Sequence, residues 1–331
     1  MIKPASKFTI IVIGYAIFIL AWFVLWLTIG DANWWLVLLI NRIVPYLFVP
    51  ALLILAWIIV SRRFKLAITL IVPGLIFAWL YHPYLFPKPA QPFGQSPELR
   101  VMTYNVLFSN MDYDAVANVV LTYQPDLVAL QEVQPEMMNA LEERLADDYP
   151  YYFMGTENTY GTTAVFSRYP FVKTEILDLR VDRPAVVVKT KINDQDITFV
   201  AIHLLAYNLW WTKLPDIPEV VMRRTANQNQ QARILLDQIE KEQGIVIVGC
   251  DCNSYETSSS YRIFDQFMDS TARQIGWLWG GNELLGAKQD VYLQHIDHVW
   301  FRGDIMPKRV YKIKDNGGSD HLPVLAIFDT K

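Results

Sequence analysis

The chain has 331 residues, of which 53% are hydrophobic and 19% are charged, and its formal net charge is −4 at pH 7. Two cysteines are too few for a disulfide framework and no repeat of fixed period is present, so small disulfide-rich scaffolds and repeat proteins are excluded. The hydrophobic excess is not spread evenly but lies near the amino terminus.

Three long runs without a charged residue lie within residues 1–86, at 8–29, 43–60 and 66–86. A membrane-spanning helix needs about 20 apolar residues, so the sequence predicts a membrane region of about three transmembrane helices. A cleaved signal peptide is the alternative for the first run, but the run exceeds the roughly 7–15 apolar residues of such a peptide. Ahead of the second run, Asn41 and Arg42 interrupt the apolar sequence.

Basic residues flank these runs asymmetrically, before the first run and between the second and third: Lys3, Lys7, Arg62, Arg63 and Lys65. The first connection holds only Asp31 and Arg42. The positive-inside rule then places the amino terminus in the cytoplasm, and three crossings place the rest of a multi-pass protein outside it. Residues 87–97 contain four prolines, which predicts a stiff, extended linker.

The remainder, residues 98–331, is long enough for one large domain with its own core. From residue 96 onward the chain holds 32 acidic and 22 basic residues, a net charge of −10. Nucleic-acid affinity rests mostly on Lys and Arg, so the sequence disfavours a nucleic-acid partner. The expected partners are the lipid bilayer and a phosphoester substrate, and no protein partner can be inferred.

Six β-like segments in this domain carry polar side chains near one end. The segments are 100–106, 126–133, 196–205, 244–251, 294–301 and 317–328. The polar residues near their ends are Asn105, Glu132, His203, Asp251, Asn253, Asp297, Asp320 and His321. Helix-like stretches at 113–121, 135–145 and 227–242 lie between the segments, which indicates an α/β domain.

Each of these polar residues alone is typical of a turn, a cap or the rim of a strand. Together they indicate a site, because ligand sites of α/β proteins gather at strand ends. Mg²⁺ binds oxygen ligands and typically takes one or two carboxylates, keeping water and substrate phosphate oxygens in the rest of its shell. The residues therefore predict a Mg²⁺-dependent phosphoester site, with Mn²⁺ or another divalent cation as the alternative.

The segment "GIVIVGCDCNSYE" has the unbroken β-branched run of a strand that is covered on both faces. Because side chains alternate along a strand, Asp251 and Asn253 share one face, while Cys250 and Cys252 point to the other. We expect the two cysteines to be small core residues, not a metal-binding pair or a disulfide.

The segments "TYNV", "LQEV", "GTTAVFSRYPF", "AIHLL", "VGCDCNS", "IDHVWF" and "SDHLPV" carry a family resemblance. Across residues 99–329 the chain resembles the endonuclease/exonuclease/phosphatase superfamily, which has the DNase I-like fold. Cys250 stands before Asp251 where the family often has glycine, but the Asp and Asn are in place. The resemblance implies a four-layer sandwich of two mixed β-sheets flanked by helices, here preceded by an N-terminal helical transmembrane region.

The resemblance also implies roles for the polar residues. Glu132 would bind the metal, assisted by Asn105, and Asp320 would be a second or water-mediated metal ligand. Asn105 would also contact substrate. By position, His298 would face away from Asp297 and is expected to be structural. His295 matches no motif and stays unassigned.

The remaining implied roles are catalytic. Asp251 and Asn253 would orient the attacking water and contact the phosphate, and His203 would stabilise developing charge or protonate the leaving oxygen. His321 would be the acid/base or phosphate partner, with its ring held by Asp297. The general base role stays open between Asp251 and His321.

Aromatic loops bear on the substrate. Trp210, Trp211 and Leu214 follow His203 in what is expected to be a loop (204–222), and Trp277 and Trp279 come later. Exposed apolar loops mark membrane or partner contact, and Trp favours the membrane interface, so Trp210 and Trp211 are candidate substrate-binding residues. The alternative is that these tryptophans fill a lid or a gap between helices.

The leading hypothesis is therefore hydrolysis of a phosphodiester of a membrane lipid or lipid-linked headgroup at the outer membrane surface. One alternative is a membrane-tethered extracytoplasmic nuclease, for which Arg223, Arg224 and Arg233 are the best candidates for a basic groove. Another is a non-catalytic membrane-associated binding protein, which is disfavoured because every expected polar position is filled.

Overall fold

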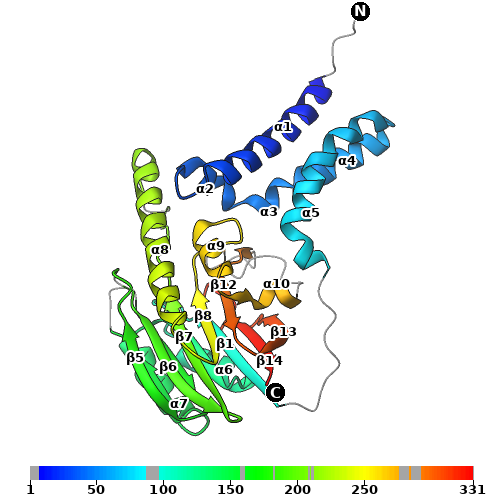
Figure 1. Ribbon diagram of the computed structural model, residues 1–331. Coiled ribbons are helices and arrows are strands. Elements are labelled where there is room, and N and C mark those ends of the chain that lie inside the picture. Colours follow the sequence, from blue (N-terminus) through cyan, green and yellow to red (C-terminus); the bar gives the residue numbers. More distant parts are fainter. Residues whose placement is uncertain are drawn as a thin grey trace, which may run out of the picture.

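The computed structural model describes residues 7–86, 97–156, 161–181, 183–207, 209, 212–275, 283–284 and 292–330. A group of apolar helices lies at one end of a two-sheet α/β domain (Figure 1). Most of the expected linker and the four tryptophans Trp210, Trp211, Trp277 and Trp279 lie outside the described residues.

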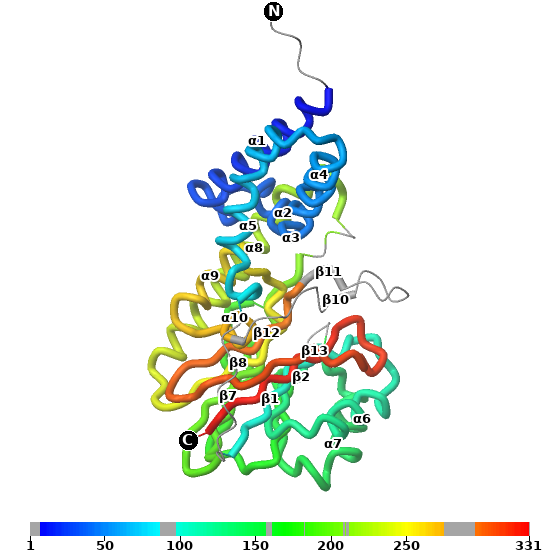
Figure 2. The backbone as a smooth tube through the Cα atoms, turned by 90° about the vertical axis from the view of Figure 1, so that its right-hand side faces the viewer, coloured from blue at the N-terminus to red at the C-terminus, as the bar shows by residue number. Residues whose placement is uncertain are grey.

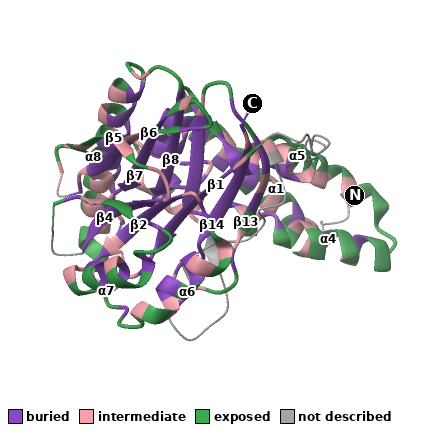
Figure 3. Ribbon diagram, turned by 90° about the horizontal axis from the view of Figure 1, so that it is seen from below, coloured by how far each residue is buried: buried purple, intermediate pink, exposed green. Residues whose placement is uncertain are grey.

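The amino-terminal region consists of α1 (Lys7–Thr28), α2 (Trp35–Asn41), α3 (Val44–Leu47), α4 (Val49–Val60), the 3-10 helix η1 (Phe64–Leu70) and α5 (Ile71–Leu85). Two helical segments are long and apolar enough to cross a membrane: α1, and η1 continued by α5, each of 22 residues. Many residues of these helices are exposed (Figure 3), and large apolar side chains such as Ile10, Ile17 and Leu75 are among them, as expected for helices that contact lipid.

The second predicted span is not one straight helix. The pair Trp35–Asn41 and Val44–Val60 bends by 78° and reaches the length of a span only if both parts are counted. α4 alone has 12 residues, about 18 Å, which is shorter than a hydrocarbon core of about 30 Å. Pro45 and Pro50 explain the breaks, because proline fits the first turn of a helix but not its interior.

Two mixed six-stranded sheets form the domain, as expected. The first has the order β13-β14-β1-β2-β4-β3, built from β1 (Glu98–Asn105), β2 (Leu127–Val133), β3 (Tyr151–Met154), β4 (Thr162–Ser167), β13 (Met306–Lys312) and β14 (Val324–Asp329). The second has the order β5-β6-β7-β8-β12-β9, built from β5 (Phe171–Leu177), β6 (Ala185–Ile192), β7 (Gln195–His203), β8 (Ile245–Asp251), β12 (Asp297–Arg302) and β9 (Asp269–Ser270). β10 (Glu283–Leu284) and β11 (Tyr292–Gln294) form a small separate sheet.

Helices cover the outer faces of both sheets. α6 (Tyr113–Tyr123) and α7 (Pro135–Leu145) pack on the first sheet, and α8 (Ile217–Ile239) and α9 (Ser259–Asp265) pack on the second. η3 (Leu214–Asp216) precedes α8, and α10 (Thr271–Ile275) follows β9. The stretch 217–222, expected to be loop, is therefore the first part of α8. Pro218 lies in the first turn of this helix, where proline is tolerated.

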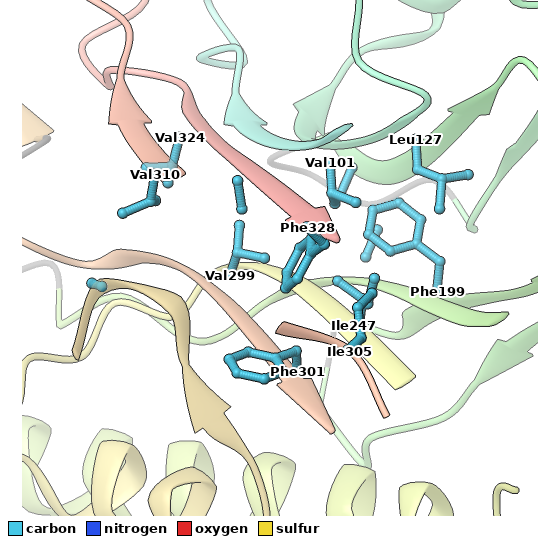
Figure 4. Close-up of a cluster of buried hydrophobic side chains, with 14 of the residues drawn as sticks. Val101, Leu127, Phe199, Ile247, Val299, Phe301, Ile305, Val310, Val324 and Phe328 are labelled. Atoms are coloured by element: carbon cyan, nitrogen blue, oxygen red, sulfur yellow. The ribbon is translucent and has the colours of Figure 1, made fainter. Parts of the chain in front are cut away.

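Between the sheets lies an apolar core (Figure 4), with Val101, Leu127 and Phe328 from the first sheet and Phe199, Ile247 and Val299 from the second. The sheets approach closely at Gly249, where a Cβ atom would lie 2.7 Å from the Cβ of Ala129. A larger residue would push the sheets apart two positions before Asp251, so this glycine is required for the geometry of the strand end.

Candidate active site

Five strands bring polar side chains to one edge of the sandwich. β1 and β2 run parallel, as do β7 and β8, so Asn105, Glu132, His203 and Asp251 lie at carboxyl ends that share an edge. β12 runs antiparallel to β8, so it begins at this edge, and Asp297 pairs with Asp251 in register. The structure thus brings together residues that are far apart in the sequence.

Asp251 lies at the centre of this cluster and is 1% exposed. Its Oδ2 accepts a hydrogen bond from Asn105 Nδ2 at 2.8 Å and lies 3.2 Å from His203 Nε2. Its Oδ1 accepts from the backbone N–H of Asn253 at 3.1 Å. The carboxylate is therefore held from three sides.

Glu132 is held in an unusual backbone conformation beside Asp251. Its φ of 62° is in the left-handed region, at an irregularity between Leu130 and Val133 in the pairing of β2 with β4. Gly161 lies against it so closely that a Cβ there would be 2.5 Å from the Glu132 carbonyl carbon. Glu132 Oε2 accepts from the backbone N–H of Phe108 at 3.0 Å, and Oε1 lies 3.7 Å from His203 Nε2.

His321 and Asp297 form a buried pair on the other side of Asp251. His321 Nδ1 lies 2.9 Å from Asp297 Oδ2. The backbone N–H of His321 donates to Ser319 Oγ, and this hydroxyl donates to the Asn105 carbonyl. Asp320, expected near the metal, is more exposed, and its Oδ1 is 4.0 Å from His321 Nε2.

Asn253 follows β8 in a left-handed backbone conformation. Its φ is 45°, and its side-chain Nδ2 donates to the carbonyl of Leu204 at 3.1 Å. The amide group thus ties the loop after β8 to the loop after β7. The side-chain oxygen remains the part of Asn253 that could contact a phosphate through a water or a metal.

Arg183 is a site residue that sequence reasoning missed. It is 8% exposed, its Nη1 contacts His203 Nε2, and the same nitrogen donates to the Leu204 carbonyl at 3.0 Å. Arg183 comes from the loop between β5 and β6, not from a strand end. A single arginine before Pro184 has no pattern that would have distinguished it from a surface residue.

The pKa values of the two histidines are shifted in opposite directions. Burial, together with the Arg183 charge, lowers the pKa of His203 well below its ordinary value, so its ring is neutral. Burial would also lower the pKa of His321, but the carboxylates of Asp297 and Asp251 raise it well above its ordinary value. Burial raises the pKa of Glu132.

The donor set fits a divalent metal ion. Glu132, His203 and Asp251 form one candidate group, and Asp251, Asp297 and His321 form another, with the ligand atoms of each group within 4.8 Å of one another. Two carboxylates and an imidazole nitrogen converge in the first group, and the two carboxylates repel each other unless a cation lies between them. Asp251, which was assigned to the water, therefore also lies where a metal would bind.

Cys250 and Cys252 are joined by a disulfide, with Cα atoms 5.0 Å apart. The expectation of two unlinked core cysteines is therefore wrong, although both side chains are buried on the face opposite Asp251. Cys252 lies just past the end of β8, and the Cα separation is shorter than the roughly 6.6 Å that two residues of a strand span, so the chain contracts there and brings the two sulfurs within bonding reach.

His298 and His295 lie outside the cluster. His298 Nε2 lies 2.8 Å from the Ser254 carbonyl, its ring packs against Tyr261, and burial lowers its pKa to about 3. His295 Nδ1 lies 3.2 Å from Glu256 Oε1.

Comparison with known proteins agrees with this geometry. The profile of the Endonuclease/Exonuclease/phosphatase family matches residues 102–321, so the chain belongs to that family. Its members are metal-dependent phosphoester hydrolases. No curated protein sequence matches the chain.

Solved structures share the fold at low identity. D. rerio TDP2 complexed with a single-strand DNA product is 19% identical, with a TM-score of 0.58, covering 70% of this chain and 99% of that one. A mannosyl-6-phosphatase of Bacteroides thetaiotaomicron is 16% identical, with a TM-score of 0.57, covering 70% and 100%. A further family protein from the same species is 16% identical, with a TM-score of 0.59, covering 72% and 96%.

Proposed function

We propose that this protein is a Mg²⁺-dependent phosphodiesterase that acts on a membrane lipid or lipid-linked headgroup at the outer membrane surface. The observation that carries the proposal is the position of the membrane helices, which pack on the same edge of the sandwich as the polar cluster. α2 contacts Tyr207, four residues after His203, and α1 contacts Thr257, six residues after Asp251. A substrate in the bilayer would therefore lie near the site.

The metal would be held by Glu132 and Asp251, with Asn105 and Asp320 close by, and it would neutralise charge on the phosphoryl oxygens. Asp251 is placed to orient the attacking water and take its proton. His321, held protonated by Asp297, is placed to stabilise the phosphoryl charge or donate a proton to the leaving oxygen. Arg183 adds hydrogen-bond donors to the phosphate side, next to the neutral His203 ring.

The surroundings of the site favour a lipid. Phe108, whose N–H binds Glu132, is 42% exposed, and Met111 in the same loop is 74% exposed. These side chains form an apolar rim beside the polar cluster. A DNA groove has less support, because Arg223 lies 3.5 Å from Glu219 and Arg224 donates to the Ala206 carbonyl.

The test uses the full-length protein in lipid nanodiscs with Mg²⁺, offered a panel of phospholipids and sphingolipids beside plasmid and single-stranded DNA. We expect headgroup release from at least one lipid and no DNA cleavage, with Asp251→Ala and His321→Ala as blanks. DNA cleavage without lipid turnover would overturn the lipid assignment but keep the phosphodiesterase.

The catalytic domain is proposed to lie outside the cytoplasm. The carboxyl end of α1 contacts the domain, so Lys7 at its amino end and Arg62, Arg63 and Lys65 near the start of η1 lie on the far side. Basic residues mark the cytoplasmic side. The disulfide supports the same orientation, because disulfides persist in oxidising compartments.

Thiol labelling checks this orientation. The protein from isolated membranes is denatured in excess maleimide without reductant, and we expect its mass to stay unchanged. After prior reduction, both cysteines are expected to carry a maleimide label. Cys252→Ser is the matched control, since Cys250 then labels without reductant. Labelling of both cysteines in the unreduced wild-type protein would contradict an oxidising location.

A further inference from the structure

The loop after Asp251 is bound directly by the membrane helices. Two side-chain donors of the membrane region converge on one backbone carbonyl of this loop, that of Thr257: Trp26 Nε1 at 2.7 Å and Asn41 Nδ2 at 3.0 Å. Trp22 Nε1 in turn donates to Asn41 Oδ1 at 3.0 Å, which fixes the orientation of the Asn41 amide. All three side chains are buried.

Asp31, in the turn after α1, also binds this segment. This carboxylate is 0% exposed and accepts from the backbone N–H of Ser259 at 2.7 Å and from Arg262 Nη2 at 3.1 Å. Ser259 begins α9, so a carboxylate from the membrane region binds the amino-terminal turn of a helix in the catalytic domain.

A third link leads from α5 to the strand of Asp297. Tyr84, in the last turns of α5, donates its hydroxyl to Glu256 Oε1 at 2.9 Å. The same oxygen lies 3.2 Å from His295 Nδ1. Glu256 comes three residues after Asn253, and His295 two residues before Asp297. One half-buried carboxylate oxygen therefore joins a membrane helix to both chain segments that carry the Asp251 and Asp297 carboxylates.

A fourth link leads from α2 to the loop after His203. Leu38 of α2 packs with Tyr207 and Val221, and the Arg42 guanidinium lies 5.5 Å from the centre of the Tyr207 ring. The Tyr207 hydroxyl donates to Gln228 Oε1 at 3.1 Å.

Gln228 of α8 is 0% exposed and joins the two catalytic loops. Its Nε2 donates to the carbonyl of Leu205 at 2.8 Å, of Asn253 at 3.1 Å and of Cys252 at 3.3 Å. Its Oε1 also accepts from Ser260 Oγ at 3.0 Å. This amide therefore holds the backbone after His203 against the backbone after Asp251.

We propose that the membrane region is a positioning element of the active site. Its helices hold the loops after His203 and Asp251 through Gln228 and Glu256, so that turnover depends on their packing even for a substrate that never enters the bilayer. Loops of this kind are otherwise the mobile parts of a fold, and a displacement of about 1 Å at a catalytic group can cost about 100-fold in rate. The proposal rests on the proposed phosphodiesterase activity but not on a lipid substrate.

Two tyrosine-to-phenylalanine variants of the full-length protein in nanodiscs test it. Tyr84→Phe removes the hydrogen bond to Glu256, and Tyr15→Phe removes a matched bond inside the membrane region, from the Tyr15 hydroxyl to the Leu47 carbonyl at 3.0 Å. The substrate is water-soluble bis(p-nitrophenyl) phosphate with Mg²⁺, which separates positioning from access to lipid.

We expect Tyr84→Phe to lower kcat between about twofold and tenfold with KM unchanged, and Tyr15→Phe to leave both unchanged. Gln228→Glu, which places an acceptor against three carbonyls, is expected to lower kcat by up to about 100-fold. In a Glu256→Leu background, Tyr84→Phe should have no further effect. Equal kcat values for Tyr84→Phe and Tyr15→Phe would overturn the proposal.

Hydrogen exchange of backbone amides in segments 204–207 and 252–258 gives a readout that needs no turnover. Faster exchange there in Tyr84→Phe than in Tyr15→Phe supports the coupling, and equal exchange rejects it. A wild-type protein that hydrolyses no phosphoester would remove the proposed function, while the exchange comparison would still decide whether the membrane helices hold these loops.

Discussion

Asp251→Asn is expected to lower kcat for phosphodiester hydrolysis by about 10²- to 10⁴-fold. The substitution keeps the size of the side chain but removes the charge and one acceptor. In the variant, one carboxylate oxygen becomes an NH2 group, whose hydrogens would point at Asn105 Nδ2, at the Asn253 N–H or at the metal. At least one of these contacts is therefore lost. The measurement is kcat at saturating Mg²⁺ and substrate.

Asp126→Asn is the matched control for this variant. Asp126 directly precedes β2, at the opposite end from Glu132, and its Oδ2 accepts from the backbone N–H of Arg100 at 2.8 Å. It should lose some thermal stability but little kcat. If Asp251→Asn kept more than a tenth of wild-type kcat while folded, Asp251 would not be at the reacting centre.

Removal of divalent cations is expected to abolish turnover, and Mg²⁺ should restore it. Because partial burial raises the pKa of Glu132 beside Asp251, protons compete with the metal, and the Mg²⁺ concentration for half-maximal rate should rise as the pH falls. Glu132→Gln should raise that concentration by at least about tenfold, by removing one of the two carboxylates that face the metal.

Thermal unfolding provides a second readout for the metal. A ligand that binds only the folded state at 100 times its Kd adds about 2.7 kcal/mol of stability, so Mg²⁺ should raise the Tm of the wild-type protein and much less that of Glu132→Gln. Full activity after exhaustive chelation, with no Mg²⁺ effect on Tm, would argue against a metal at this site.

Part of this site could be predicted from the sequence because its residues lie at strand ends. The Val/Ile run before Asp251 marks a buried strand, and the motifs around Glu132 and His321 place the others at the same edge. Arg183 and Gln228 could not be found this way. One comes from a loop and the other from a helix interior, and their importance arises from carbonyl groups that only the folded chain brings to them.

The membrane region shows the same division. The first and third apolar runs coincide with α1 and with the segment of η1 and α5, but hydropathy does not report direction, so the 78° bend between α2 and α3 was missed. The packing of these helices on the catalytic edge was also beyond the sequence, because it depends on single buried polar residues such as Asp31, Asn41 and Tyr84.

The packing of α1, α2 and α5 on the domain (Figure 2) also affects whether a protease could release the catalytic domain from these helices. A cut between residues 87 and 96 would break the only covalent connection, yet Trp26, Asp31 and Tyr84 would still bind the loop and helix after Asp251. The two fragments should therefore stay together as a nicked complex. Cleavage of the linker would then be a poor way to release this domain as a soluble factor.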